Sequence, residues 1–551
     1  MNNRTRLFWL LGGLALLAVI ALVFSPTVQH LAGAALNIPT VTCDQISQIP
    51  AGECAALKAL YDSTQGANWG NAGNWFMTTT PCDGWFGVAC QNQGVSNNIV
   101  SLRLGGNQLK GSLPTELGQL TELKILELNG NQLSGALPVS LGALSKLETL
   151  DLSYNQLTGS LPPEIINLPA LKFLRLQANQ LSGALPGSPT LSGEQPSLGG
   201  ASSLEELSLQ YNQFSGSIPA GWDKYSRLKS LYLQMNQLSG PIPPELANLA
   251  ALENIDLSSN QFSGALPADL GKLKGLKILY LGSNQLSGSI PAALSGMNAL
   301  QDFGLQSNQI TGTIPSELSS LVNLRYLNLS NNRLQGGIPA SFANLNKLQQ
   351  LIVSGNLLTA DLPPELGNIA TLTTLDVGKN ALPGEIPPAL VGVVSAGSGM
   401  SDYVSFGYNM LDASDPQLVE KLNAKDKNWQ RTQTLPPDNL AAQQGPNGKV
   451  TLTWTPIAYT ADGGFYEISY ATSENGPYTV AGVTVDKSSA TFDVTGLTIG
   501  TLYFFRVRTH TPPHLDQQNA LWSVYTTPIS VIAINKETPE QQKFYLPIIR
   551  R

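Results

Sequence analysis

The sequence predicts a β-rich solenoid of stacked repeats, followed by a smaller β-sandwich near the C-terminal end. Three observations carry this prediction. An asparagine recurs at a fixed interval from Asn107 to Asn380, apolar residues alternate just before each of these asparagines, and a different alternating pattern replaces the repeat after residue 434. A chain of 551 residues is too long for one compact core, so we expect an elongated array.

The recurring asparagine keeps one frame through the repeat region. The interval is 24 residues except between Asn179 and Asn212, where it is 33, and most of the excess is the polar stretch 187–195. A degenerate further unit ends at Asn409. The twelve positions are 107, 131, 155, 179, 212, 236, 260, 284, 308, 332, 356 and 380.

The positions around each asparagine predict the shape of one repeat. Leu126 and Leu128 precede Asn131 with one residue between them, which predicts a short strand with one buried face. We expect the asparagine itself to be buried, with its amide bound to backbone groups of the turn. A proline stands seven residues after every one of the twelve asparagines, where it turns the chain away from the strand.

This pattern, L-x-x-L-x-L-x-x-N-x-L-x-G-x-[IL]-P, resembles the 24-residue plant-type leucine-rich repeat. The resemblance implies a leucine-rich repeat horseshoe of about 12–13 repeats over residues 101–410, with the strands on its concave side. It also implies covers for the two ends of the core. We expect an N-terminal cap at residues 43–100 and a C-terminal cap at residues 411–434, with Asp415 as the N-cap of a helix.

All four cysteines lie before the repeats: Cys43, Cys54, Cys82 and Cys90. An even number in an exported chain favours disulfides, and four cysteines allow three pairings. Pairing of neighbours, Cys43 with Cys54 and Cys82 with Cys90, is the arrangement that we expect. A zinc site is disfavoured because the chain has no C-x-x-C spacing.

Residues 437–534 resemble a fibronectin type III domain. Five segments alternate between apolar and polar residues, and the region has no cysteine, which fits a β-sandwich without the immunoglobulin disulfide. Trp454 on an early strand and Tyr503 as the corner tyrosine carry the resemblance. The segments are 449–456, 465–472, 490–497, 501–509 and 521–532, and a polar-to-apolar tail follows at residues 535–551.

The N-terminus predicts export. Arg4 and Arg6 precede an apolar run at residues 7–24, so residues 1–36 are either a signal peptide or an N-terminal membrane anchor. Both alternatives place the rest of the chain outside the cytoplasm, secreted or at the cell surface. The net charge of −7 argues against nucleic acid as a partner, and a membrane partner is expected only through the apolar run.

The chain offers little material for catalysis. It has three histidines, and the motifs of nucleophilic and metal-dependent hydrolases are missing from the sequence. His510, His514 and Asp516 lie within seven residues, but the prolines between them indicate a rigid loop rather than a metal site. We therefore expect a protein that is not an enzyme and that needs no cofactor or metal.

The variable strand residues are the candidate binding site. They should point away from the core onto the concave face, and the repeat pattern does not require tyrosine, phenylalanine or charge there. We expect a protein, peptide or glycan ligand; the alternatives are an inhibitor of secreted hydrolases and a structural cell-surface adhesin. The candidate residues are Glu127, Asp151, Tyr154, Phe173, Arg175, Tyr211, Tyr232, Asp256, Tyr280, Asp302 and Tyr326.

Overall fold

The computed structural model describes residues 40–92, 97–187, 203–395 and 403–535, which divide into two compact units on either side of residue 329/330. The expected export segment 1–36 and nearly all of the tail 535–551 lie outside the described residues, as does most of the insertion 187–195. Within the described ranges, no helix has both the length and the apolar character needed to cross a membrane.

The first unit begins with a disulfide-bonded cap. Cys43 is bonded to Cys54 and Cys82 to Cys90, the pairing of neighbours expected from the sequence. Helix α2 (Ala51–Ser63) packs with a cluster of buried rings that includes Trp75. The shorter elements of the cap are the 3₁₀ turns η1 (Cys43–Gln45), η2 (Gly66–Asn68) and η3 (Pro81–Asp83), and strand β1 (Val88–Asn92).

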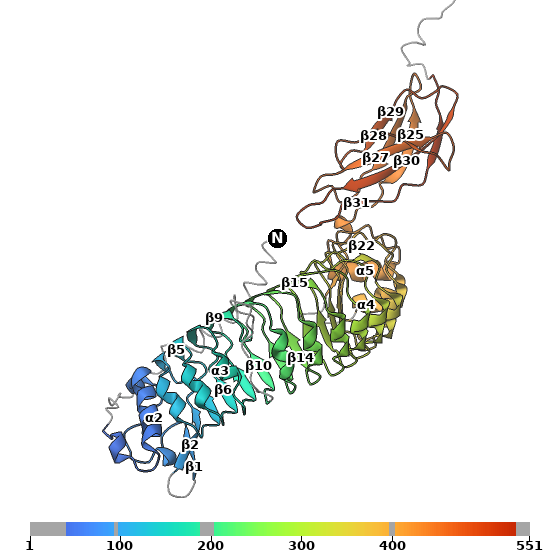
Figure 1. Cartoon of the computed structure of the whole chain (residues 1–551). Helices are drawn as coiled ribbons and strands as arrows, with labels where there is room; N and C mark the ends of the chain where they lie inside the picture. Colours follow the sequence, from blue (N-terminus) through green and yellow to red (C-terminus); the bar gives the residue numbers. More distant parts are fainter. Residues whose placement is uncertain (1–39, 93–96, 188–202, 396–402, 536–551) are drawn as a thin grey trace, which may run out of the picture. The chain divides into compact units, whose positions relative to one another are not determined.

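The strands before the ladder asparagines form one long sheet, called here the concave sheet (Figure 1). Strand β1 pairs antiparallel with β2, and every later strand of this unit pairs parallel with the strand of the preceding repeat. The strands are β2 (Asn97–Arg103), β4 (Ile125–Glu127), β6 (Thr149–Asp151), β8 (Phe173–Arg175), β10 (Glu206–Ser208), β12 (Ser230–Tyr232), β14 (Asn254–Asp256), β16 (Ile278–Tyr280), β18 (Asp302–Gly304) and β19 (Tyr326–Asn328).

A second parallel sheet follows the asparagines, in the part of each repeat where the sequence predicts the turn. Gly135 has a φ of 79°, which a residue without Cβ adopts readily, and this bends the chain at the end of the strand. The strands are β3 (Lys110–Ser112), β5 (Gln132–Ala136), β7 (Gln156–Gly159), β9 (Gln180–Ala184), β11 (Gln213–Gly216), β13 (Gln237–Gly240), β15 (Gln261–Ala265) and β17 (Gln285–Ser287).

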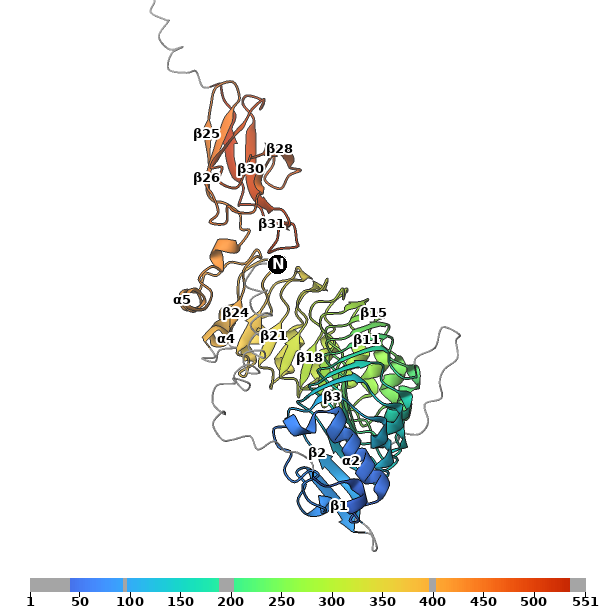
Figure 2. The same cartoon turned by 90° about the vertical axis from the view of Figure 1, so that its left-hand side faces the viewer.

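In the first unit, a short helical turn starts directly after the repeat proline wherever the structure describes the residues that follow it, because proline has no N–H to leave unpaired and its φ already suits the turn. Figure 2 shows these turns one above another along the solenoid. They are η4 (Thr115–Gln119), η5 (Val139–Ala143), α3 (Pro163–Ile166), η6 (Ala220–Lys224), η7 (Pro244–Asn248), η8 (Ala268–Lys272), η9 (Ala292–Gly296) and η10 (Ser316–Ser320).

The asparagine ladder forms as the sequence predicts. Asn236 is buried, and its Nδ2 donates to the carbonyl oxygens of Leu209 (3.0 Å) and Leu233 (3.1 Å). Its Oδ1 accepts from the backbone N–H of Phe214 at 2.9 Å. Asn236 thus ties its own strand to the preceding repeat, and the leucines of the strands fill the core between the turns.

The second unit continues the same repeat and closes it. Helix α5 is capped by Asp415, whose side chain accepts from the N–H of Leu418 at 2.8 Å. Gln433 then takes the place of a ladder asparagine, because its Oε1 accepts from Leu411 N–H at 3.0 Å. The elements are β20 (Gln335–Gly336), η11 (Ala340–Asn344), β21 (Gln350–Ile352), β22 (Leu357–Leu358), η12 (Pro364–Asn368), β23 (Thr374–Asp376), η13 (Pro388–Leu390), α4 (Val391–Ser395), β24 (Val404–Ser405), α5 (Pro416–Lys425) and η14 (Gln430–Thr432).

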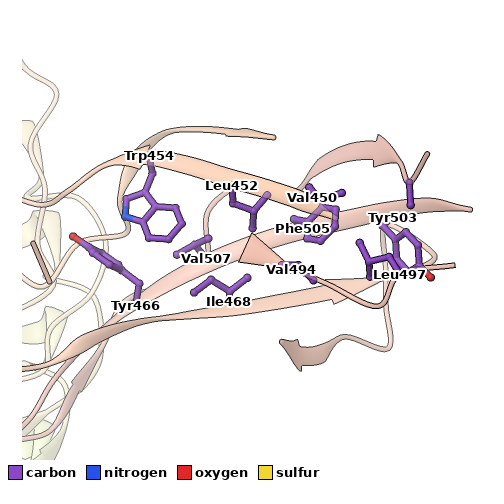
Figure 3. Packing of buried hydrophobic residues seen from close by; sticks show 11 residues of the cluster. Val450, Leu452, Trp454, Tyr466, Ile468, Val494, Leu497, Tyr503, Phe505 and Val507 are labelled. Atoms are coloured by element: carbon purple, nitrogen blue, oxygen red, sulfur yellow. The ribbon is translucent and has the colours of Figure 1, made fainter. Parts of the chain in front are cut away.

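The C-terminal domain is an antiparallel sandwich of two sheets, β25-β26-β29 and β28-β27-β30 with β31 and β32 both paired to β30. Its core includes Trp454, and the hydroxyl of Tyr503 accepts from the N–H of Thr498 at 3.1 Å, as expected for a corner tyrosine (Figure 3). The strands are β25 (Asp438–Gln444), β26 (Val450–Thr455), β27 (Phe465–Ala471), β28 (Thr479–Val483), β29 (Thr491–Val494), β30 (Leu502–Thr511), β31 (Leu521–Trp522) and β32 (Ile529–Ile532).

Three details of the sandwich differ from the sequence prediction. Strands β25 and β28 were not expected, because they are edge strands with few buried side chains and so lack a strong alternating pattern. The segment 521–532 is not one strand. It divides into β31 and β32, and Pro528, which has no N–H for the ladder, stands just before β32.

The loop between β30 and β31 binds the last repeats through three consecutive amide side chains. Gln517 donates to the carbonyl oxygens of Asn380 (2.9 Å) and Tyr408 (2.6 Å), and Asn519 donates to that of Asn356 (2.8 Å). Gln518 donates to the carbonyl oxygen of Gly355 at 2.9 Å. The histidine-containing loop therefore contributes side-chain amides to the carbonyl edge of the repeats.

Candidate functional site

The concave sheet of the first unit presents two parallel columns of variable side chains. The residue four positions before each ladder asparagine pairs with its equivalent in the next strand, so that Tyr232, Asp256 and Tyr280 are neighbours on β12, β14 and β16. The residue six positions before the asparagine forms the second column, in which Asp302 pairs with Tyr326. The middle residue of each strand is buried in the core, so these columns face away from it.

At the N-terminal end of the sheet, the candidates Glu127 and Arg175 are each bound to a charged residue of a neighbouring strand. The Nη1 of Arg103 donates to Glu127 at 2.5 Å, and Arg175 forms two bonds of 2.8 and 2.7 Å to Glu206. Burial opposes ionisation of Glu206, but its bonds to Arg175 and Ser208 outweigh burial and lower its pKa. These charges neutralise each other across the strands, so we assign them to the scaffold.

Two further candidates also lie outside a continuous surface. Asp151 accepts from the backbone N–H and the hydroxyl of Ser153, at 3.0 and 2.6 Å. The ring of Phe173 lies under the guanidinium of Arg175, with 5.1 Å between the ring centroid and Cζ.

Tyr154 and Tyr211 are exposed by 53% and 49%, but they belong to repeats that are not adjacent. The repeat between them carries Ala178 at the same position. The structure therefore does not bring these two rings together.

The remaining candidates form the tyrosine–aspartate patch: Tyr232, Asp256, Tyr280, Asp302 and Tyr326. They come from five successive strands, β12 to β19, and every one of them is partly exposed. The rings of Tyr280 and Tyr326 meet edge to face, with centroids 6.3 Å apart. The hydroxyl of Tyr326 accepts from the Nδ2 of Asn328 at 2.8 Å, which fixes the orientation of this ring.

The patch is a partly desolvated, acidic surface. Burial raises the pKa of Tyr280 to about 12, and Asp302, Tyr326 and Asp256 add to this rise. Burial also raises the pKa of Asp256, although two bonds from Ser258 to its Oδ1, at 3.0 and 2.6 Å, oppose the rise. Such a surface favours a partner that brings apolar area and positive charge.

The second unit contains a cavity of about 420 Å³ that the sequence analysis did not identify. Asp376 at its wall accepts from the hydroxyls of Ser354 (2.8 Å) and Tyr403 (3.1 Å), and burial raises its pKa. The lining residues are Ser354, Asp376, Gly378, Lys379, Ser405, Gly407, Tyr408, Asp426, Asn428, Arg431 and Thr432. Extending the columns to the last repeats would have found Asp376 and Ser405, but Asp426 and Arg431 follow the repeats and carry no such signal.

Comparison with known families agrees with this architecture. Residues 121–181, 250–310 and 305–358 match one leucine-rich repeat profile, and residues 98–120, 203–224 and 227–249 match a second. Residues 435–514 match the fibronectin type III domain. A comparison with curated protein sequences gave no significant match.

Among solved structures, similar chains come from plants and from a bacterium. The plant peptide hormone receptor RGFR1, solved in complex with RGF2, is 29% identical over 57% of this chain and 52% of its own, with a TM-score of 0.51. A Leptospira interrogans leucine-rich repeat protein is 31% identical over 57% of this chain and 74% of its own, with a TM-score of 0.46. This chain thus spans about half of the length of the plant receptor chain.

Proposed function

Since the chain belongs to the leucine-rich repeat proteins and carries a fibronectin type III domain after its repeats, we propose that it recognises a peptide or protein ligand on its concave sheet, without catalysis. The observation that supports this most is the tyrosine–aspartate patch, which gathers three tyrosines on alternate strands of the concave sheet, with no scaffold role for Tyr232 or Tyr280 in the repeat pattern. The plant receptor with similar repeats, which was solved with RGF2, supports the peptide class.

The proposal places the protein outside the cytoplasm. Both disulfides of the cap fit an oxidising compartment. Residues 1–36 would export the chain, and the secreted and anchored forms differ in whether residues 7–24 are retained. We propose no catalysis, since four of the five acidic residues discussed on the concave sheet, Glu127, Asp151, Glu206 and Asp256, are each bound to an arginine or a serine of the scaffold.

The double substitution Tyr232→Ala with Tyr280→Ala should abolish ligand capture and leave the protein folded. Both rings are partly exposed, so we expect a stability loss of about 1 kcal/mol, whereas the loss of two aromatic anchors should weaken binding by about 100-fold or more. The measurement is capture of peptides and glycans on an array by the full chain, with thermal unfolding followed in parallel. The control is Phe86→Ala, which removes an exposed ring from the cap.

Unchanged capture by the double variant would contradict a site at the patch. Capture of glycans alone would replace the peptide class by a carbohydrate. An adhesin would tolerate both substitutions and lose attachment when residues 437–534 are deleted. A hydrolase inhibitor would be revealed by suppressed turnover of a secreted polysaccharide hydrolase mixed with the wild-type chain.

A further inference from the structure

The carboxylates of the concave sheet differ in whether the protein itself satisfies them. Glu127 and Glu206 are paired with arginines, and Asp151 and Asp256 each accept two bonds from a serine two residues later. Asp302 has no such partner. Within the ranges that the structure describes, no residue forms a hydrogen bond or an ion pair with its side chain. This carboxylate is partly buried and lacks a counter-charge at contact distance.

The surroundings of Asp302 are aromatic. Tyr326 is its direct partner on the next strand, and Tyr280 stands one strand before it in the neighbouring column. The two rings pack edge to face beside the carboxylate. Burial raises the pKa of Asp302, and the more distant Arg325 lowers it in part. A carboxylate placed in this way is costly until a cation reaches it.

Gly304 leaves room for Tyr280 in this arrangement. A Cβ atom added to Gly304 would lie 2.9 Å from Oε1 of Gln306 and 3.0 Å from Cδ1 of Tyr280, so the ring rests against the backbone of β18. A larger residue would push the ring away from the strand that carries Asp302. Gly304 therefore allows the ring of Tyr280 to lie against the strand that carries Asp302.

We propose that Asp302, Tyr280 and Tyr326 form a binding site for a cationic side chain, an arginine or a lysine of the peptide ligand. This inference rests on the proposed function, and it adds that the ligand carries a positively charged group at this position. The carboxylate supplies the counter-charge, and the aromatic rings attract a cation through their electron-rich faces. An anionic group would be repelled by Asp302 and also by the nearby Asp256.

The test uses the full chain and two blocked tripeptides, Gly-Arg-Gly and its neutral isostere Gly-citrulline-Gly, measured by saturation-transfer NMR. We expect saturation of the arginine peptide and much weaker saturation of the citrulline peptide. Asp302→Asn should weaken binding of the arginine peptide by about tenfold or more, because it removes the charge without changing the shape. Gly304→Ala should weaken it by about threefold through displacement of Tyr280.

The matched control is Asp269→Asn, a carboxylate of η8 that is paired with Lys272 away from the patch. It should bind the arginine peptide like the wild-type chain. Equal saturation by the two peptides, unchanged binding in Asp302→Asn, or no saturation in the wild-type chain would overturn the cation site. Any of these three results would still be compatible with the proposed function, provided that the wild-type chain captures ligands on the peptide and glycan array and that Tyr232→Ala with Tyr280→Ala loses this capture.

Discussion

Replacing Asn236 by alanine should lower the free energy of unfolding by about 3 kcal/mol or more. The carboxamide satisfies the N–H of Phe214 and the carbonyl oxygens of Leu209 and Leu233, all inside the solenoid. Alanine leaves these backbone groups buried without partners, and each such group costs about 1–3 kcal/mol. Relaxation of the turn recovers part of that cost.

Denaturant unfolding measures the total effect, and hydrogen exchange at the N–H of Phe214 measures the local one. In a repeat protein each unit contacts its neighbours, so we expect faster exchange mainly in the repeats on either side of Asn236. Gln237→Ala is the control, because its exposed side chain lies directly after the ladder position. A loss below about 1 kcal/mol in Asn236→Ala would mean that the ladder contributes little to stability.

The stability of the N-terminal cap should fall as the pH rises from 4.5 to 7. Glu53 of α2 is only 3% exposed, and burial raises its pKa from 4.5 to about 7, although the N–H of Ile99 donates to it at 2.9 Å and opposes the rise. Between these values the folded cap binds a proton that the unfolded chain has lost. The stabilisation is therefore complete below pH 4.5, and it is lost as the pH rises to the folded-state value.

The difference corresponds to about 3 kcal/mol, at about 1.4 kcal/mol for each pKa unit. The measurement is unfolding of the cap at several pH values, followed by the fluorescence of its tryptophans. Glu53→Gln keeps an acceptor for Ile99 but cannot ionise, so its stability should stay level over this range. Parallel pH profiles for the two proteins would show that other groups cause the dependence.

The sequence was sufficient for the repeat fold because the pattern itself is the physical constraint. A leucine at a fixed place in each strand and an asparagine after it can be satisfied only when neighbouring repeats stack in register. Asn131 and Asn236 occupy equivalent environments, so one repeat predicts the next. The edge strands β25 and β28 of the sandwich have no buried side chain and carry no such constraint, which is why the sequence does not predict them.

The candidate site was only partly predictable, because exposure and pairing depend on side chains from different repeats. Arg103 and Glu127 share one column, so their ion pair could have been read from the 24-residue interval. Arg175 and Glu206 belong to different columns, and the insertion separates them in the sequence. The 24-residue interval therefore does not predict their ion pair. Asp302 resembles the other acidic positions until its surroundings are known.

The loop that carries Gln517, Gln518 and Asn519 limits where the number of repeats can change during evolution. Its amides meet backbone carbonyls that recur once per repeat, including those of Asn356 and Asn380. Duplication or deletion of whole repeats before Asn332 would leave this attachment untouched. The array can therefore gain or lose length by recombination upstream, whereas changes among the last repeats require a matching change in the loop.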